Sequence, residues 1–275
     1  MKYTSTRSRR QKSPLVRTLT AITIATAVLS FACGAWYTYT LNHSATVNLA
    51  EVDLIQLDGP QDGDPIALMH TTAGDLTFRL FPNECPKTVE NFVQLAESGY
   101  YNGTYVFRVE DGIFFAAGSP NHDGSLADDV TNDAPAESVP RELSPDLWPL
   151  QGALCALETK TDGGFFRTLF GKQVHYCGSR FMVANSIEMT GEITESLTKE
   201  SETNPVAKAF LEHGGIPNYA QQITVFGQLF DGEDTLDTIT HCETHGETGA
   251  KCPKKDILIE SIEIGVFTSD SIEKE

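Results

Sequence analysis

The stretch Thr72-Ala-Gly-Asp-Leu-Thr-Phe-Arg-Leu-Phe-Pro-Asn-Glu-Cys-Pro-Lys-Thr-Val-Glu-Asn-Phe92 decides the fold class of this chain. With the preceding residues 66–71 it predicts a β-hairpin, because two apolar runs flank the turn-forming residues 72–75. Pro86 then suits the first turn of a helix, where the missing N–H costs nothing. We therefore expect a hairpin followed by a helix over residues 86–98.

The rest of the chain is rich in short apolar runs that are typical of strands. These runs cover residues 104–109, 113–116, 152–157, 180–184, 223–229 and 257–267. A second helix is expected over residues 233–239. Many short strands with few helices favour a mainly β fold, either a closed antiparallel barrel or a sandwich.

Two long stretches interrupt the spacing of these strands, near residues 119–147 and 187–218. The first is acidic and loop-like, and the second has room for a short helix over residues 204–212. Loops of this length are often functional, but a solvated insertion without a role fits the sequence equally well.

Four segments, taken in order, resemble the cyclophilin family of peptidyl-prolyl cis-trans isomerases. They are the 72–92 stretch, Gly99-Tyr-Tyr-Asn-Gly-Thr-Tyr-Val-Phe-Arg-Val-Glu-Asp-Gly112, Gly178-Ser-Arg-Phe-Met-Val183 and Val225-Phe-Gly-Gln-Leu-Phe-Asp-Gly232. The resemblance covers residues 66–265. Asp146-Leu-Trp148 and Gly152-Ala-Leu154 are similar to a divergent bacterial branch. The resemblance implies an eight-stranded antiparallel closed barrel capped by two helices.

The resemblance places Arg108 at the family's catalytic arginine. Rotation about a peptide bond faces a barrier of roughly 18–20 kcal/mol. A guanidinium lowers it by donating a hydrogen bond to the prolyl nitrogen as that atom becomes pyramidal, and an apolar pocket strengthens this bond. Arginine suits the role because it stays charged and presents a planar set of donors. The chemistry requires no nucleophile, metal or cofactor, and we expect none.

The predicted pocket around Arg108 departs from the family pattern. Ile113 and Phe114 stand at the family's Phe-Met pair, Met182 replaces a phenylalanine, and Tyr219 lies near the pocket edge. At the remaining positions, Phe107 and Ile223 replace histidines of the family, and Ala116 and Arg180 replace glutamines. Leu157 and Glu158 stand at the family's Ala-Asn pair, which normally binds the peptide backbone. The pocket thus stays apolar and loses most of its hydrogen-bonding lining. We expect weakened activity, and we hypothesise that Arg180 and Glu158 form a replacement ion pair.

Five cysteines follow the N-terminal region. We predict disulfides between Cys242 and Cys252 and between Cys155 and Cys177, because an exported domain meets an oxidising environment. A zinc site built from His241, His245 and two of these thiols is a weaker alternative, since the spacing matches no standard pattern.

The basic and acidic residues are distributed unevenly along the chain. The whole chain has a net charge of −18, but six basic residues lie within residues 1–17, which leaves 14 basic against 38 acidic residues and a net charge of −24 for the remainder. A body this acidic argues against nucleic-acid binding. Residues 18–41 carry no charge, and this length predicts a transmembrane signal anchor with a cytoplasmic basic tail. A cleaved signal peptide and a lipid-anchored Cys33 stay open as alternatives.

The sequence therefore predicts a basic cytoplasmic tail (1–17), a membrane anchor (18–41), a linker (42–65), a cyclophilin-like domain (66–267) and an acidic tail (268–275). The expected protein sits in the cell membrane with its body outside. The expected activity is isomerisation of Xaa-Pro bonds in exported polypeptides, which would assist their folding. The alternative is a non-catalytic module that binds proline-containing peptides or acts as a chaperone. Nothing in the sequence indicates an oligomeric state.

Overall fold

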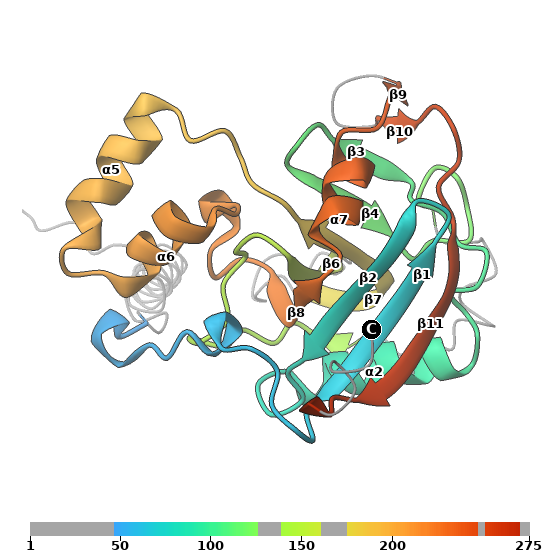
Figure 1. Cartoon of the computed structure of the whole chain (residues 1–275), viewed down its shortest axis with the longest axis horizontal. Coiled ribbons are helices and arrows are strands. Elements are labelled where there is room, and N and C mark those ends of the chain that lie inside the picture. Colours follow the sequence, from blue (N-terminus) through green and yellow to red (C-terminus); the bar gives the residue numbers. More distant parts are fainter. Residues whose placement is uncertain (1–46, 126–138, 161–174, 247–250, 270–275) are drawn as a thin grey trace, which may run out of the picture. The chain divides into compact units, whose positions relative to one another are not determined.

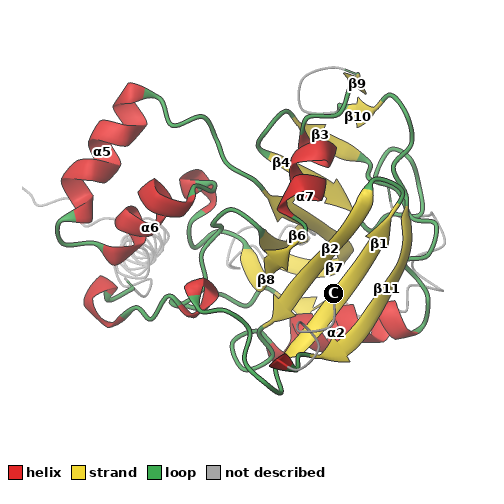
Figure 2. Cartoon of the chain, viewed as in Figure 1, coloured by secondary structure: helices red, strands yellow, loops and turns green. Residues whose placement is uncertain are grey.

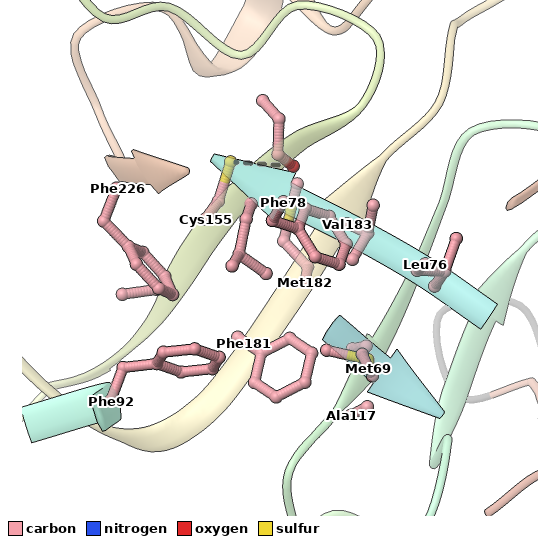
Figure 3. Packing of buried hydrophobic residues seen from close by; sticks show 14 of the residues in the cluster. Met69, Leu76, Phe78, Phe92, Ala117, Cys155, Phe181, Met182, Val183 and Phe226 are labelled. Atoms are coloured by element: carbon pink, nitrogen blue, oxygen red, sulfur yellow. Dashed lines mark hydrogen bonds between the residues drawn. The ribbon is translucent and has the colours of Figure 1, made fainter. Parts of the chain in front are cut away.

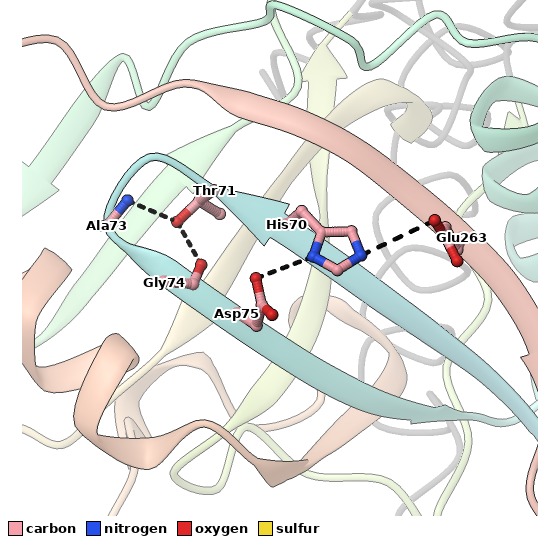
Figure 4. A network of polar contacts seen from close by, with 6 residues as sticks. All are labelled: His70, Thr71, Ala73, Gly74, Asp75 and Glu263. Carbon is pink, nitrogen blue, oxygen red and sulfur yellow. Dashed lines mark hydrogen bonds and ion pairs between the residues drawn. The ribbon is translucent and has the colours of Figure 1, made fainter.

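A computed structural model describes residues 47–125, 139–160, 175–246 and 251–269 (Figure 1). The predicted hairpin is confirmed as β1 (Pro65–Thr71) and β2 (Gly74–Leu80), paired antiparallel from Ile66 opposite Arg79 to Thr71 opposite Gly74. Alternate residues of both strands are buried, as a strand with one face on a core requires. The turn is closed by Thr71, whose hydroxyl donates to the Gly74 carbonyl at 2.6 Å and accepts from the Ala73 N–H (Figure 4).

The outward face of this hairpin carries a polar contact across three strands. His70 Nδ1 lies 2.9 Å from Asp75 Oδ1 on β2, and its Nε2 lies 3.9 Å from Glu263 Oε1 on β11 (Ile259–Val266) (Figure 4). The three side chains are partly or largely exposed, so this contact adds little to stability.

One antiparallel sheet holds most of the strands (Figure 2). Its order is β11-β1-β2-β8-β6-β7-β4-β3, and β5 pairs with β7 off this path. The remaining strands of this sheet are β3 (Arg108–Glu110), β4 (Phe114–Ala117), β5 (Val139–Pro140), β6 (Ala153–Lys160), β7 (His175–Ala184) and β8 (Thr224–Asp231). A separate two-stranded sheet pairs β9 (Thr244–His245) with β10 (Cys252–Pro253).

The prediction of an eight-stranded closed barrel is confirmed only in part: the curled, mainly antiparallel sheet is present, and full closure is not shown. The nine-stranded sheet curls as a half-barrel, and in the described part of the chain no continuous ladder joins β3 to β11. An isolated bridge between Tyr105 and Leu258 and a bond from Val106 N–H to the Ile257 carbonyl (2.9 Å) link the two ends. The Val109 N–H donates instead to the Lys251 carbonyl at 2.8 Å. The outer edge of β3 is therefore occupied by the segment next to β10.

Both predicted capping helices are present, as α2 (Pro86–Glu97) and α7 (Glu233–Thr240). The Glu142 carboxylate accepts from the Lys87 N–H, the Thr88 N–H and the Thr88 hydroxyl at 2.8–3.3 Å. It thereby satisfies backbone donors that the first turn of α2 leaves open, and its charge suits that helix end. This contact ties the end of the 119–147 insertion to the domain.

The core lies between α2 and the inner face of the sheet (Figure 3). The Phe92 ring on α2 lies 5.2 Å from Phe226 and 5.9 Å from Phe181, and the second contact is edge-to-face. Met69 and Leu76 from the hairpin are fully buried in the same cluster. The alternation predicted for residues 66–80 therefore supplies one wall of this core.

The second insertion contains α5 (Gly191–Ser201) and α6 (Pro205–His213), which pack against each other. The predicted 204–212 helix is confirmed as α6. The Asn204 side chain accepts from the N–H groups of Val206 and Ala207 at 3.0 and 3.2 Å, which is a standard N-cap. No side chain of α5 is buried.

The predicted linker differs from the structure over most of its length. The compact unit begins at Asn48, and short 3-10 turns occur at η1 (Leu49–Glu51) and η2 (Ile55–Leu57). Gln56 is buried and donates to Gln228 Oε1 at 2.9 Å, and Arg79 Nε lies 2.7 Å from Asp64. Residues 48–65 are thus tied to the domain, because their polar groups pair with residues on β2 and β8.

The predicted membrane anchor at residues 18–41 lies outside the described residues. Within the described ranges, no helix has the length and apolarity needed to cross a membrane.

Candidate active site

Arg108 sits at the start of β3, in a tight hairpin with β4. Successive residues of a strand point to opposite faces. Val109 is therefore buried in the core, and the side chains of Arg108 and Glu110 share the other face. The turn between the strands uses Gly112 at φ +67, and its N–H donates to the Thr240 carbonyl at the end of α7. This helix thereby fixes the hairpin that carries the arginine.

The Arg108 guanidinium is held on two sides. Glu110 Oε1 accepts from its Nε at 3.1 Å and from its Nη2 at 2.8 Å. The guanidinium carbon lies 5.3 Å from the centroid of the Phe114 ring, within the range of a cation–π contact. The Arg108 side chain is 38% exposed and that of Glu110 is 17% exposed. The arginine is thus anchored and still reachable from solvent.

An apolar floor continues from Arg108 across the neighbouring strands. Arg108 stands opposite Ala116 on β4, Ala116 stands opposite Met182 on β7, and Met182 stands opposite Cys155 on β6. Directly opposite residues of antiparallel strands share a face of the sheet. Ala116, Met182 and Cys155 are all buried and offer no strong hydrogen-bonding group. Of the predicted site residues, Arg108, Phe114, Ala116 and Met182 are brought together.

Arg180 lies two residues before Met182 on β7, and its side chain contacts the loop at Gly124. Its Nη1 donates to the Gly124 carbonyl at 2.8 Å, and burial lowers the pKa of this guanidinium. Gly124 adopts φ +74, and a Cβ there would clash with the Phe107 ring. The loop at Gly124 therefore packs on the residue before Arg108 and is tied to β7 by Arg180.

Glu158 is also committed elsewhere. Its Oε1 lies 3.4 Å from Arg141 Nε, and its backbone pairs with Cys177 rather than with Arg180. Glu158 is therefore about three residues, or roughly 10 Å, from the level of Arg180 along the β6–β7 ladder. The hypothesised Arg180–Glu158 ion pair is wrong, because the register separates the two residues. Leu157, at the bulge in this ladder, is half-buried.

The remaining predicted pocket residues lie on three separate segments. Ile113 is half-buried at the end of the β3–β4 turn and packs against the core. Tyr219 ends η3 (Pro217–Tyr219) and is 37% exposed. Ile223 is half-buried just before β8.

Neither predicted disulfide is present, because the strand registers keep the partners apart. Cys155 stands opposite Met182 and Cys177 opposite Glu158 on the same ladder. In the β9–β10 hairpin, Cys252 pairs with His245, and the bond from Lys254 N–H to the Glu243 carbonyl extends this register to Glu243, the neighbour of Cys242. Cys242 therefore falls about three residues from Cys252, beyond the reach of a disulfide. The ranges that the structure describes contain no group of three or more side chains that could hold a metal ion. The alternative zinc site at His241 and His245 is therefore not found there.

Comparison with known proteins decides the family. The model of the family described as "Cyclophilin type peptidyl-prolyl cis-trans isomerase/CLD" matches residues 66–264. The chain belongs to this family. It is 35% identical over 210 residues to a Staphylococcus saprophyticus protein named "Putative peptidyl-prolyl cis-trans isomerase", covering 76% of this chain and 96% of that protein. A Staphylococcus aureus protein of the same name is 33% identical over 204 residues, with 74% and 93% coverage.

Solved structures of cyclophilins share the fold. A crystal structure of the cyclophilin-type isomerase of Cryptosporidium parvum has a TM-score of 0.52 at 22% identity, covering 75% of this chain and 99% of that one. The same protein solved in the presence of the dipeptide Ala-Pro has a TM-score of 0.50. The chain described here therefore has a mainly β, cyclophilin-like domain, as its motifs predicted.

The partner of Arg108 was missed from the sequence. Glu110 follows two residues after the arginine on a predicted strand, so period-two alternation alone places both side chains on one face. The sequence comparison considered only the positions at which the family has its pocket residues. Glu110 stands at none of those positions.

Proposed function

We propose that this cyclophilin catalyses cis-trans isomerisation of Xaa-Pro bonds, with Arg108 as the catalytic residue. The observation that carries the proposal is the guanidinium fixed over Phe114 beside a buried apolar floor. Of the five N–H donors of an arginine, Glu110 engages one on Nε and one on Nη2. Within the described residues nothing accepts from Nη1, so this atom is open toward a substrate.

The proposed mechanism needs only binding and one hydrogen bond. The proline ring rests on the apolar side chains of Ile113, Phe114 and Met182, with Tyr219 at the edge. Arg108 Nη1 donates to the prolyl nitrogen as it becomes pyramidal, which weakens amide resonance in the twisted transition state more than in either ground state. The apolar floor strengthens this bond by lowering the local dielectric constant. No atom of the substrate is exchanged, and no covalent bond to the protein forms.

We propose that turnover is slower than a fully lined groove would allow. Ala116, Leu157 and Ile223 cannot hydrogen-bond a peptide backbone through their side chains, and Glu158 and Arg180 are engaged with Arg141 and Gly124. The rival function is a proline-peptide-binding or chaperone module without turnover, and this same loss of polar lining favours it.

A coupled proline-isomerisation assay on the full-length protein in mild detergent separates the two functions. We expect the wild type to exceed the uncatalysed rate and Arg108→Ala to fall close to it. Rates that equal the background for both proteins, with proline-peptide binding retained, would replace the enzyme with the binding module.

We propose that the natural substrates are exported polypeptides whose folding the protein assists. The charge-free residues 18–41 after a basic cluster support a single-pass anchor that holds the acidic body outside the membrane. In intact cells, an impermeant protease should degrade the body while residues 1–17 stay protected. A body that becomes accessible only after lysis would refute this orientation.

A further inference from the structure

We propose that Glu110 is the positioning residue of Arg108, a role that this chain places on β3 itself because Ala116, opposite the arginine on β4, has no polar side chain. The inference rests on the proposed function for its meaning in catalysis. Its geometric part concerns only how the guanidinium is held.

The contact between the two side chains has the geometry of a fixed orientation. A single oxygen, Glu110 Oε1, accepts from both Nε and Nη2, at 3.1 and 2.8 Å. These two donors lie on one edge of the planar guanidinium, so the carboxylate fixes the plane as well as the distance. The Phe114 ring lies 5.3 Å from the guanidinium carbon and supplies a second restraint.

The carboxylate also determines which donor faces a substrate. With the Nε–Nη2 edge engaged, Nη1 is the group left open, and it is the one that the mechanism uses. Across the sheet from Arg108, Ala116 and Met182 offer no competing strong acceptor. In the described residues, Glu110 is the only side chain that accepts a hydrogen bond from Arg108.

The burial of Glu110 distinguishes this contact from an ordinary surface ion pair. Exposed pairs cost side-chain entropy to form and often contribute nothing measurable. The Glu110 side chain is 17% exposed, whereas Glu263, which approaches His70 on the far strand β11, is 71% exposed. A glutamate with little freedom can hold its partner in one orientation, and Glu263 provides the matched control.

The test compares Glu110→Ala, Glu110→Gln and Glu263→Gln with wild type in the full-length protein. Removal of a group that orients a metal ligand typically costs about 10–100-fold. By analogy, we expect Glu110→Ala to lower kcat roughly tenfold with KM nearly unchanged. Glu110→Gln keeps an oxygen acceptor and should recover most of the rate. Glu263→Gln removes the same charge from the same sheet and should behave as wild type. A rate for Glu110→Ala at or above wild type, or a Glu110→Gln variant no better than Glu110→Ala, would overturn the proposal.

A second readout does not depend on activity. The Arg108 Nε–H resonance, assigned by its loss in Arg108→Lys, should be sharp in wild type and in Glu110→Gln and broadened in Glu110→Ala. Thermal unfolding checks that each variant is folded. An Nε–H signal that is the same in Glu110→Ala and wild type would overturn the positioning role even in an active enzyme. Failure of the proposed function would appear separately, as a wild-type rate equal to background.

Discussion

The two sides of the site treat their charged residues in opposite ways. On the β3–β4 side, Arg108 is held by Glu110 and Phe114 and keeps Nη1 open. On the β6–β7 side, Glu158 and Arg180 are turned to Arg141 and to the Gly124 carbonyl. Under the proposed function, the first side presents the donor that accelerates rotation, and the second side has its charged groups engaged within the protein. We expect changes on the first side to alter kcat and changes on the second side to alter KM.

The largest expected effect comes from Arg108. Losing one preorganised donor to a transition state typically costs 10²–10³ in rate, or about 2.7–4 kcal/mol. Arg108→Ala should therefore lower kcat/KM by at least about a hundredfold. Arg108→Lys retains the charge but lacks the planar fork, and it should recover only a small part of the loss. A lysine variant as fast as wild type would show that charge alone suffices.

The next effect is on stability and concerns Cys177, which is buried on β7 beneath the β6–β7 side. Burial raises the pKa of this thiol from its ordinary 9.0 to about 11. The folded state therefore favours the neutral thiol, and ionisation of the unfolded chain costs stability above pH 9. The contribution should be complete below pH 9 and lost by about pH 11, up to about 3 kcal/mol.

Chemical denaturation between pH 8 and 11 measures this effect. Cys177→Ala should show a shallower decline of unfolding free energy with pH than wild type, whatever its stability at pH 8. Equal slopes for the two proteins would mean that the thiol titrates normally in the folded state.

A smaller effect should follow from restoring the family's Ala-Asn pair on the β6–β7 side. In Leu157→Ala/Glu158→Asn, the new amide can hydrogen-bond a peptide backbone, which is worth about 1 kcal/mol net. KM should fall about fivefold with kcat unchanged. A matched exposed change, Glu195→Asn on α5, should do neither. A rise in kcat in the double variant would break the division between the two sides.

The smallest effect is expected at Tyr219. Its exposed ring lies at the predicted pocket edge and is not part of the buried core. Tyr219→Ala should raise KM by less than about threefold and change the unfolding free energy by no more than about 0.5 kcal/mol. Titration of a proline peptide and thermal unfolding measure the two quantities. A tenfold weaker affinity would make Tyr219 a main contact of the proline ring.

Local patterns predicted the parts of the fold that local physics dictates. The hairpin over residues 66–80, the helix from Pro86 and the helix that Asn204 caps follow from alternation, helix caps and proline geometry. Cysteine pairing and barrel closure depended on strand register, which spacing along the chain does not reveal. The packing of residues 48–65 depends on distant partners such as Gln228 and Arg79. It could not be predicted, because a free linker and a segment packed on the domain contain the same polar turn-forming residues.

The candidate site was predictable in position and less so in its contacts. The motif around Arg108 located the arginine, and the register brought Ala116 and Met182 beside it. The partners of Glu158 and Arg180 could not be predicted, because either residue had many oppositely charged or carbonyl partners in an acidic chain. Glu110 was within reach of sequence reasoning, through its two-residue offset from Arg108.

Exchange spectroscopy by NMR on one proline peptide tests the central claim most directly, since it reports binding and turnover in the same sample. We predict that wild-type protein produces cis-trans exchange cross-peaks and shifts the peptide resonances. Arg108→Ala should produce the same shifts and no cross-peaks on the exchange timescale. Exchange cross-peaks of equal intensity with Arg108→Ala would contradict the assignment of catalysis to this arginine.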